Sequence, residues 1–162
     1  MNPLLKVMTR VAVALVVAMS GIAGVAASPA QAGSLDPKPH TWYESHVIMS
    51  INAQRTAHGL RALTPASCPD RFAESLAQKL RWTKTLWHQS LGPILSTCHA
   101  TRASENIVRA SRYTKTPALV KLWMNSPGHR ANILDPRVNQ IGVGTTCTPS
   151  NVCTTVADFI RR

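Results

Sequence analysis

The stretch SPGHRANIL, residues 126–134, carries clear signals for the start of a short helix. Ser126 supplies a capping hydroxyl, and Pro127 has the backbone angle that suits the first helical position. Asp135-Pro136 ends the segment, so we expect a helix over residues 128–134. His129 lies near its start, where the positive end of the helix dipole favours a neutral imidazole. A neutral imidazole can bind a metal ion or act as a base.

Helical patterns dominate the chain upstream of this stretch. Apolar residues at helical spacing, with Gly59 as a C-terminal signal, predict a first helix from about residue 41. The same spacing predicts a second helix over residues 70–83. Thr116-Pro117 predicts the start of a third, with a hydroxyl cap followed by proline.

Strand patterns dominate the end of the chain. Residues 140–146 and 152–160 alternate as strands around a polar turn, which predicts an antiparallel hairpin. Residues 104–110 fit either a helical turn or a short strand, and we expect a loop from Pro93 to about residue 101. Helices first and strands last indicate an α+β fold, with helices packed on a small antiparallel sheet.

Composition limits the class of protein. The chain has 162 residues, which suits one domain, and 44% of them are hydrophobic, which allows a packed core. Lys and Arg number 18 against 7 Asp and Glu, a formal net charge of +11. This charge favours adhesion to polyanions, but the basic residues are scattered along the sequence. No nucleic-acid recognition motif is present, so we expect no nucleic-acid partner.

The first 32 residues predict export. Lys6 and Arg10 precede a nine-residue apolar run, residues 11–19, and Ala30-Gln31-Ala32 forms a cleavage pattern. The run is too short and too interrupted for a transmembrane anchor. Cleavage after Ala32 removes two basic residues and leaves a net charge of +9. We therefore expect a secreted, extracellular protein with an extended lead-in over residues 33–40, a domain over residues 41–162 and only peripheral membrane association.

Four cysteines fit two disulfides in an oxidising compartment. Cys147 and Cys153 flank the predicted hairpin turn, so we pair them. Cys68 and Cys98 remain, and their bond would tie the second helix to the loop after it. A structural zinc site is the alternative, but no C-x2-C spacing is present.

Three residues are candidates for a functional site. His88 follows Trp87 and, with Trp82, closes an aromatic patch, while Glu105 is the only acid between Glu74 and Asp135. Together with His129 they could hold a divalent cation with open positions. They could equally form a buried ion pair that fixes three loops. The spacing alone leaves both interpretations open.

The stretch SPGHRANIL, followed by Ile141-Gly142-Val143-Gly144, closely resembles the CAP superfamily, also called the SCP or sperm-coating-protein domain. This superfamily includes cysteine-rich secretory proteins, antigen 5 and pathogenesis-related protein 1. Leu122-Trp123-Met124-Asn125 is similar to its secreted bacterial branch. Ser104-Glu105-Asn106-Ile107 resembles the Gly-Glu-Asn-Ile motif of the family, with serine in place of glycine. The resemblance covers about residues 42–160.

The resemblance implies an α-β-α sandwich with a central cleft lined by two histidines and two glutamates. His88, Glu105 and His129 match three of these positions. The second glutamate has no counterpart between Glu105 and Asp135, so the resemblance implies at most a three-ligand site for a cation such as zinc. We expect a non-enzymatic, monomeric binding module for a lipid, sterol, cell-wall polyanion or host ligand. The alternative is a metal-dependent extracellular hydrolase that uses the same cleft.

Overall fold

The computed structural model describes residues 42–162. The predicted signal peptide, its cleavage site and the lead-in lie outside these residues. The described part contains the following elements in chain order: α1 (Trp42–Ala57), β1 (Thr64–Pro65), α2 (Ser67–Leu80), α3 (Gly92–Thr97), β2 (Arg102–Ser111), α4 (Thr116–Met124), α5 (Pro127–Ile133), β3 (Gln140–Cys147) and β4 (Val152–Arg161).

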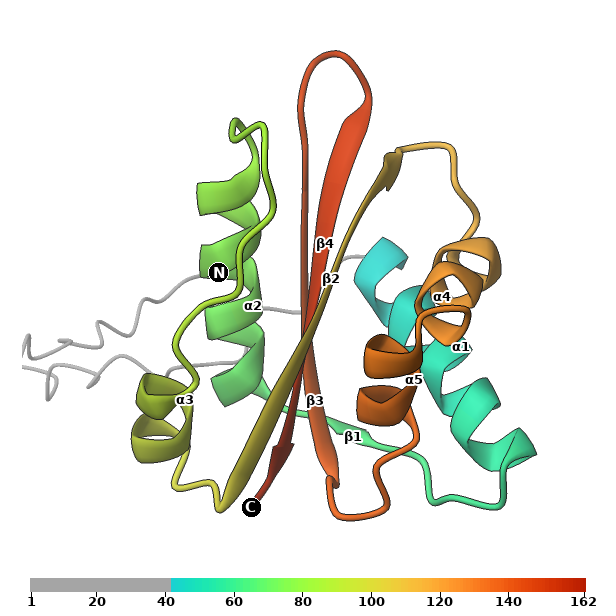
Figure 1. Cartoon of the computed structure of the whole chain (residues 1–162), viewed down its shortest axis with the longest axis vertical. Coiled ribbons are helices and arrows are strands. Elements are labelled where there is room, and N and C mark those ends of the chain that lie inside the picture. The colour runs from blue at the N-terminus through green and yellow to red at the C-terminus, as the bar shows by residue number, and fades with distance from the viewer. Residues whose placement is uncertain (1–41) are drawn as a thin grey trace, which may run out of the picture. The chain divides into compact units, whose positions relative to one another are not determined.

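The elements form three layers around one central sheet (Figure 1). The strand order is β1-β3-β4-β2, so β2 is an edge strand. Helices α2 and α3 cover one face, and α1, α4 and α5 cover the other. Strands β2, β3 and β4 are antiparallel, while the two-residue β1 pairs in parallel with β3. The α+β sandwich is therefore confirmed, and the sheet is mixed because of the short β1.

The local predictions differ from the structure in three places. The ambiguous segment 104–110 lies within strand β2, since it pairs along its whole length with β4. The expected loop after Pro93 was wrong, because Ile94 is buried and residues 92–97 form α3. Ser126 precedes α5 as predicted, but its side chain makes no capping hydrogen bond. Thr116 likewise lies inside α4 and not at its cap.

Two apolar layers hold the helices onto the sheet. On the α1, α4 and α5 side, Ile51, Trp123 and Phe159 belong to one continuous buried cluster. On the opposite side, Leu76 and Leu80 of α2 pack on the sheet beside Ile107 and Val156. Each large apolar side chain that is fully buried contributes about 1.5–3 kcal/mol relative to exposure. Alternation along β4 thus serves two cores, which explains why residues 153–160 are buried throughout.

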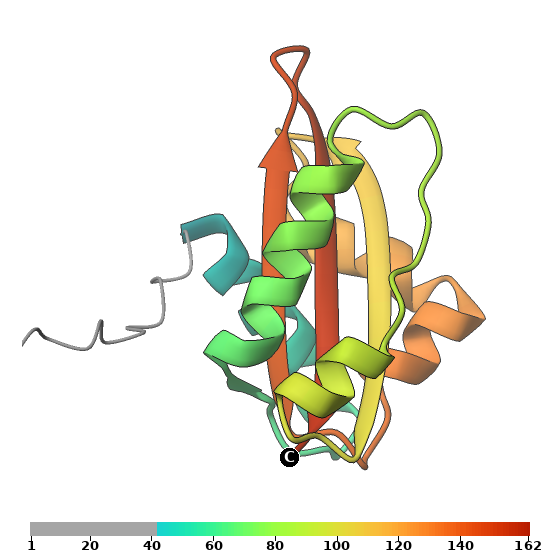
Figure 2. The same ribbon diagram turned by 90° about the vertical axis from the view of Figure 1, so that its left-hand side faces the viewer.

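Helix α2 lies directly against β3 because two glycines remove side chains from the contact (Figure 2). A Cβ atom at Gly142 would lie 2.0 Å from the backbone nitrogen of Asp70, and one at Gly144 would lie 2.3 Å from that of Glu74. Both distances are far below van der Waals contact. The Gly-Val-Gly part of the sequence motif is therefore required by the packing of α2 on the sheet.

Both predicted disulfides are confirmed. Cys68–Cys98 joins the start of α2 to the residue that follows α3, and Cys147–Cys153 closes the β3–β4 hairpin. The described part contains no free cysteine. The longer loop spans 30 residues, and closing a loop of that size stabilises a fold by about 3–4 kcal/mol in the chain-entropy model.

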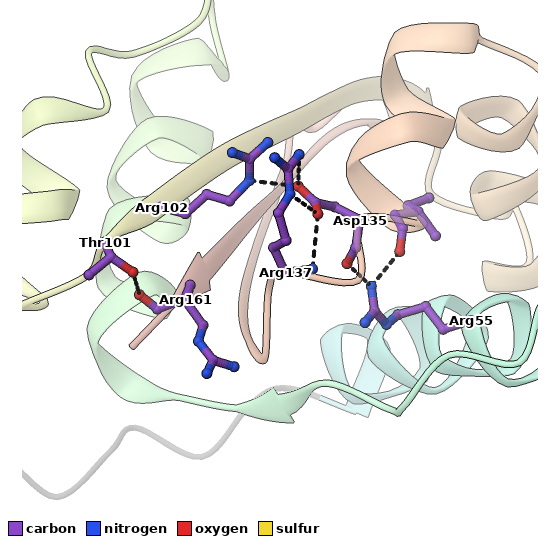
Figure 3. A network of polar contacts seen from close by, with 7 residues as sticks. Arg55, Thr101, Arg102, Asp135, Arg137 and Arg161 are labelled. Carbon is purple, nitrogen blue, oxygen red and sulfur yellow. Dashed lines mark hydrogen bonds and ion pairs between the residues drawn. The ribbon is translucent and has the colours of Figure 1, made fainter.

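A buried acid, Asp135, lies after α5 in a network of arginines (Figure 3). Arg102 Nε donates to Asp135 Oδ2 at 2.6 Å, and Arg137 Nε donates to Oδ1 at 2.8 Å. The fully buried Arg55 donates from Nη1 to the backbone oxygens of Asp135 and Ile133, at 2.9 and 2.7 Å. Helix α1 and the edge strand β2 are thereby tied to the turn after α5.

The arginines determine the charge state of Asp135. Burial alone would raise the pKa of its carboxyl. The hydrogen bonds from Arg137 and Arg102 outweigh that effect and lower the pKa to about 2. Asp135 is therefore ionised throughout the physiological range and stabilises the folded state there.

Candidate functional site

Glu105 lies opposite a second acid in the sheet. In the β2–β4 register Glu105 pairs with Asp158, so both side chains project from the same face, the one covered by α2. Glu105 is 5% exposed and Asp158 is fully buried. Two carboxyl groups are therefore brought together in a nearly water-free part of the molecule.

The buried position of Asp158 changes its protonation. Burial raises the pKa of Asp158 well above its usual value, and the charge of Glu105 raises it further. A hydrogen bond from Gln89 opposes these effects but does not cancel them. As an ionised acceptor, Asp158 Oδ1 has no hydrogen-bond partner. A proton on Asp158 would make it a donor to Glu105.

The loop over residues 81–91, between α2 and α3, closes over this acid pair. His88 Nδ1 lies 2.5 Å from Glu105 Oε1, and Gln89 Nε2 donates to Glu105 Oε2 at 2.8 Å. Gln89 Nε2 also lies 3.1 Å from Asp158 Oδ2. Since a carboxylate only accepts, His88 Nδ1 carries the hydrogen in this contact. The His88 side chain is 62% exposed against 2% for Glu105, so the histidine covers the acid and itself faces solvent.

Two asparagines attach α5 to the edge strand. Asn106 Nδ2 donates to the backbone oxygen of His129 at 3.0 Å, and Asn132 Nδ2 donates to the backbone oxygen of Glu105 at 3.1 Å. Asn132 Nδ2 also donates to Asn106 Oδ1 at 2.9 Å. These contacts join side chains and backbone of α5 to side chains and backbone of the edge strand β2. They fix the backbone of His129 beside β2.

His129 lies close enough to His88 for the two rings to interact electrostatically. Partial burial lowers the pKa of His129, and its electrostatic interaction with His88 lowers it further. A neutral His129 agrees with the direction predicted from the sequence. The causes in the structure are burial and the neighbouring His88.

The predicted ligand set His88, Glu105 and His129 does not form a ready-made metal site. Within residues 42–162, no group of three or more His, Cys, Asp or Glu side chains is arranged to hold a metal ion. Both oxygens of Glu105 are engaged, one by His88 Nδ1 and the other by Gln89. The residues in this arrangement do not fit a divalent cation, and the zinc site stays a prediction.

Sequence reasoning missed two members of this cluster. It searched for a second acid only between Glu105 and Asp135, whereas Asp158 lies on β4 and reaches Glu105 through the strand register. The available signal was an acid inside the apolar strand TTVADFI, where an unpaired charge is costly. Gln89 directly follows the candidate His88. Nothing in the sequence marks its amide as functional, and only the structure shows that it contacts Glu105 and Asp158.

The same loop exposes large apolar side chains. Trp82 is 68% exposed, Trp87 43% and Leu86 41%. The guanidinium of Arg81 lies 4.8 Å from the ring centre of Trp82. Beneath the loop, Arg109 Nη2 donates to the backbone oxygen of Leu80 at 2.9 Å.

Further contacts to the loop make this exposure a fixed feature. Arg109 Nη1 donates to the backbone oxygen of Lys84 at 3.2 Å, and Thr83 Oγ1 donates to that of Thr85 at 2.9 Å. With His88 and Gln89 bonded to the acid pair, polar contacts hold both ends of the segment. We refer to residues 81–91 below as the tryptophan loop. Trp82, Leu86 and Trp87 of this loop face solvent, while His88 and Gln89 bond to the acid pair beneath it.

Comparison with known proteins decides the family. Residues 49–159 match the sequence model of the cysteine-rich secretory protein family, named CAP. The chain belongs to this family. YkwD of Bacillus subtilis is 34% identical over 117 residues, which cover 67% of this chain and 44% of that protein. The CAP chain studied here thus spans less than half the length of this curated relative.

Solved structures share the CAP fold. An extracellular protein of Bacillus anthracis that contains an SCP domain superposes with a TM-score of 0.60 at 24% identity, covering 74% of this chain and 40% of that chain. An outer surface protein of Borrelia burgdorferi superposes with a TM-score of 0.59 at 22% identity, covering 72% of this chain and 90% of that one. Among residues 42–162, no helix combines the length and apolar character needed to cross a membrane.

Proposed function

We propose that this CAP protein is an extracellular, non-enzymatic binding module that holds a lipid or sterol on its tryptophan loop. The observation that carries the proposal is the combination of two exposed tryptophans and a leucine on a segment whose polar groups are bonded to the sheet below. Tryptophan combines a large apolar surface with one polar group, which suits the boundary between water and lipid. A loop already held in place loses little conformational freedom on binding.

The acid pair supports this role by positioning the loop. His88 and Gln89 follow Trp87 directly, and both bond to the buried Glu105. The carboxyl groups thereby act through the loop and do not touch the ligand. Extracellular relatives and the absence of a membrane-spanning helix within residues 42–162 agree with action outside the cell.

The alternative is a metal-dependent hydrolase that uses His88, Glu105 and His129. The contacts of Glu105 weigh against it, because its oxygens would have to share or give up their bonds to His88 and Gln89 before Glu105 could bind an ion or act as a general base. Metal-dependent hydrolysis also needs a bound water that the protein can activate. Within residues 42–162, no group of three or more His, Cys, Asp or Glu side chains is arranged to hold the ion that would bind this water.

The test of binding is co-sedimentation of purified protein with sterol-containing phospholipid vesicles. The double variant Trp82→Ala/Trp87→Ala should lose affinity by about tenfold or more, since two partly buried rings no longer contact the lipid. The matched control Trp42→Ala/Tyr113→Ala removes two exposed aromatic side chains elsewhere and should bind like wild type. Equal losses in both variants would refute the tryptophan loop as the site.

The test of the alternative is an activity assay of wild type with zinc against peptide and ester panels. The binding proposal predicts no turnover. Metal-dependent hydrolysis that disappears in Glu105→Gln would replace it with the hydrolase.

A further inference from the structure

A cavity of about 480 Å³ lies between the α1–β1 connection, the start of β3 and the end of β4. Its lining is part apolar, and its polar lining residues are Arg55, Arg61, Arg161, Thr64, Asn139 and Gln140. Arg61, Thr64 and Arg161 are exposed, so the cavity opens to solvent, while Arg55 is fully buried beneath it. The cavity shares no lining residue with the tryptophan loop.

The arginine side chains give this cavity a positive charge. No Asp or Glu lines it. Within residues 42–162, neither the Arg61 nor the Arg161 guanidinium forms an ion pair. Arg55 bonds only to backbone oxygens, and the nearest acid, Asp135, already accepts from Arg102 and Arg137 (Figure 3). Two exposed arginines that are distant in the sequence, Arg61 and Arg161, therefore line one opening.

We infer that this arginine-lined cavity binds the oxyanions of a phosphate-bearing polymer. The planar guanidinium matches the geometry of phosphate oxygens and can donate two parallel hydrogen bonds. Several arginines around one opening fit successive phosphates of a chain better than one isolated anion. A bilayer surface fits less well, because none of the exposed large apolar side chains of residues 42–162 lines the cavity to enter the lipid. The inference is independent of the proposed role of the tryptophan loop.

The experiment measures binding of purified protein to long-chain inorganic polyphosphate over a series of salt concentrations. The test variant is Arg61→Ala/Arg161→Ala, and the matched control is Arg71→Ala/Lys79→Ala on the exposed surface of α2. Both variants remove two positive charges. The Arg61→Ala substitution leaves its backbone oxygen free to accept from Arg55 Nε as before. Circular dichroism and thermal unfolding confirm that each variant is folded, and single Arg→Gln variants at 61 and 161 replace the pair if it is not.

The inference predicts that the test variant binds polyphosphate about tenfold or more weakly, with a salt dependence less steep by about one unit for each lost phosphate contact. The control should stay within about twofold of wild type, since it leaves the cavity intact. Equal weakening of both variants would show that only net charge matters and would overturn the site. No binding by wild type at about 0.15 M salt would also overturn it. Binding of phosphatidylglycerol vesicles through Arg61 and Arg161, without binding of polyphosphate, would overturn it as well.

Discussion

Asp135 and Asp158 are both buried acids, yet their surroundings move their pKa values in opposite directions. Asp135 accepts from two arginines, which lower its pKa to about 2. Asp158 has a second acid and an amide as neighbours, and its pKa rises. The first is a structural contact that stabilises the fold at neutral pH. Asp158, with its raised pKa, lowers the stability of the fold at neutral pH. Groups that lower stability in this way are concentrated at functional sites.

The position of each acid in the fold matches this difference. Asp135 joins α1, β2 and the turn after α5 at one end of the molecule. Asp158 lies in the middle of the sheet, under a loop that exposes two tryptophans. The comparison indicates that the arginine network maintains the scaffold, whereas the acid pair maintains the shape of a surface.

The largest expected effect comes from Asp135→Asn. Loss of the ionised acceptor should lower the free energy of unfolding at pH 7 by about 2 kcal/mol, the value that corresponds to a pKa lowered from 3.8 to about 2. Because the folded-state pKa is depressed, this contribution is complete above about pH 4 and is lost as the pH falls toward 2. Urea unfolding of both proteins across that range measures it. A difference that does not shrink in acid would contradict the ionic account.

A smaller effect of opposite sign is expected from Asp158→Asn. The amide imitates the protonated acid, can donate to Glu105, and avoids the cost of burying a second charge. Because the folded-state pKa is raised, wild type loses stability as the pH rises above about 4, the unfolded value. The variant should be more stable at pH 7 by about 1 kcal/mol and less dependent on pH. Thermal unfolding at pH 4 and pH 7 tests this, and a destabilised variant with an unchanged pH profile would refute it.

The smallest change in stability is expected from His88→Ala. Its side chain is mostly exposed, so we expect a loss of only about 0.5 kcal/mol, within the range of surface contacts. The local effect should be larger, because the loop loses one bond to Glu105. Hydrogen exchange of backbone amides in residues 83–88 should accelerate while exchange in α1 stays constant. Unchanged exchange in the loop would show that His88 does not hold it.

The sequence was sufficient for features whose signals are local. Periodicity located α1 and α2, and Thr116-Pro117 located the start of α4. The turn between Cys147 and Cys153 located both the hairpin and its disulfide. Segment 104–110 could not be assigned because polar and apolar residues occur on both faces of this edge strand, so the alternation typical of a strand is absent.

The candidate site was only partly predictable, because its contacts join residues that are distant in the sequence. Glu105 and Asp158 meet only when β2 and β4 pair in one register, and a shift by one residue would place them on opposite faces. The arginines around Asp135 likewise come from α1, β2 and a turn. His88 and Glu105 do lie in contact. Both were candidate site residues because of their side-chain types and because they match positions of the CAP family.

The measurement that tests the central claim most directly is a pH titration of the Asp158 and Glu105 carboxyl carbons by ¹³C NMR, with and without zinc. The account predicts that Asp158 stays protonated well above its usual pKa, and that zinc leaves both carboxyl signals unchanged at pH 7. Both results would follow if Glu105 and Asp158 bond to His88 and Gln89 and thereby position the tryptophan loop. Two carboxyl groups that both titrate near pH 4, or a zinc-dependent shift of Glu105 together with His88 and His129, would contradict it and favour a metal centre.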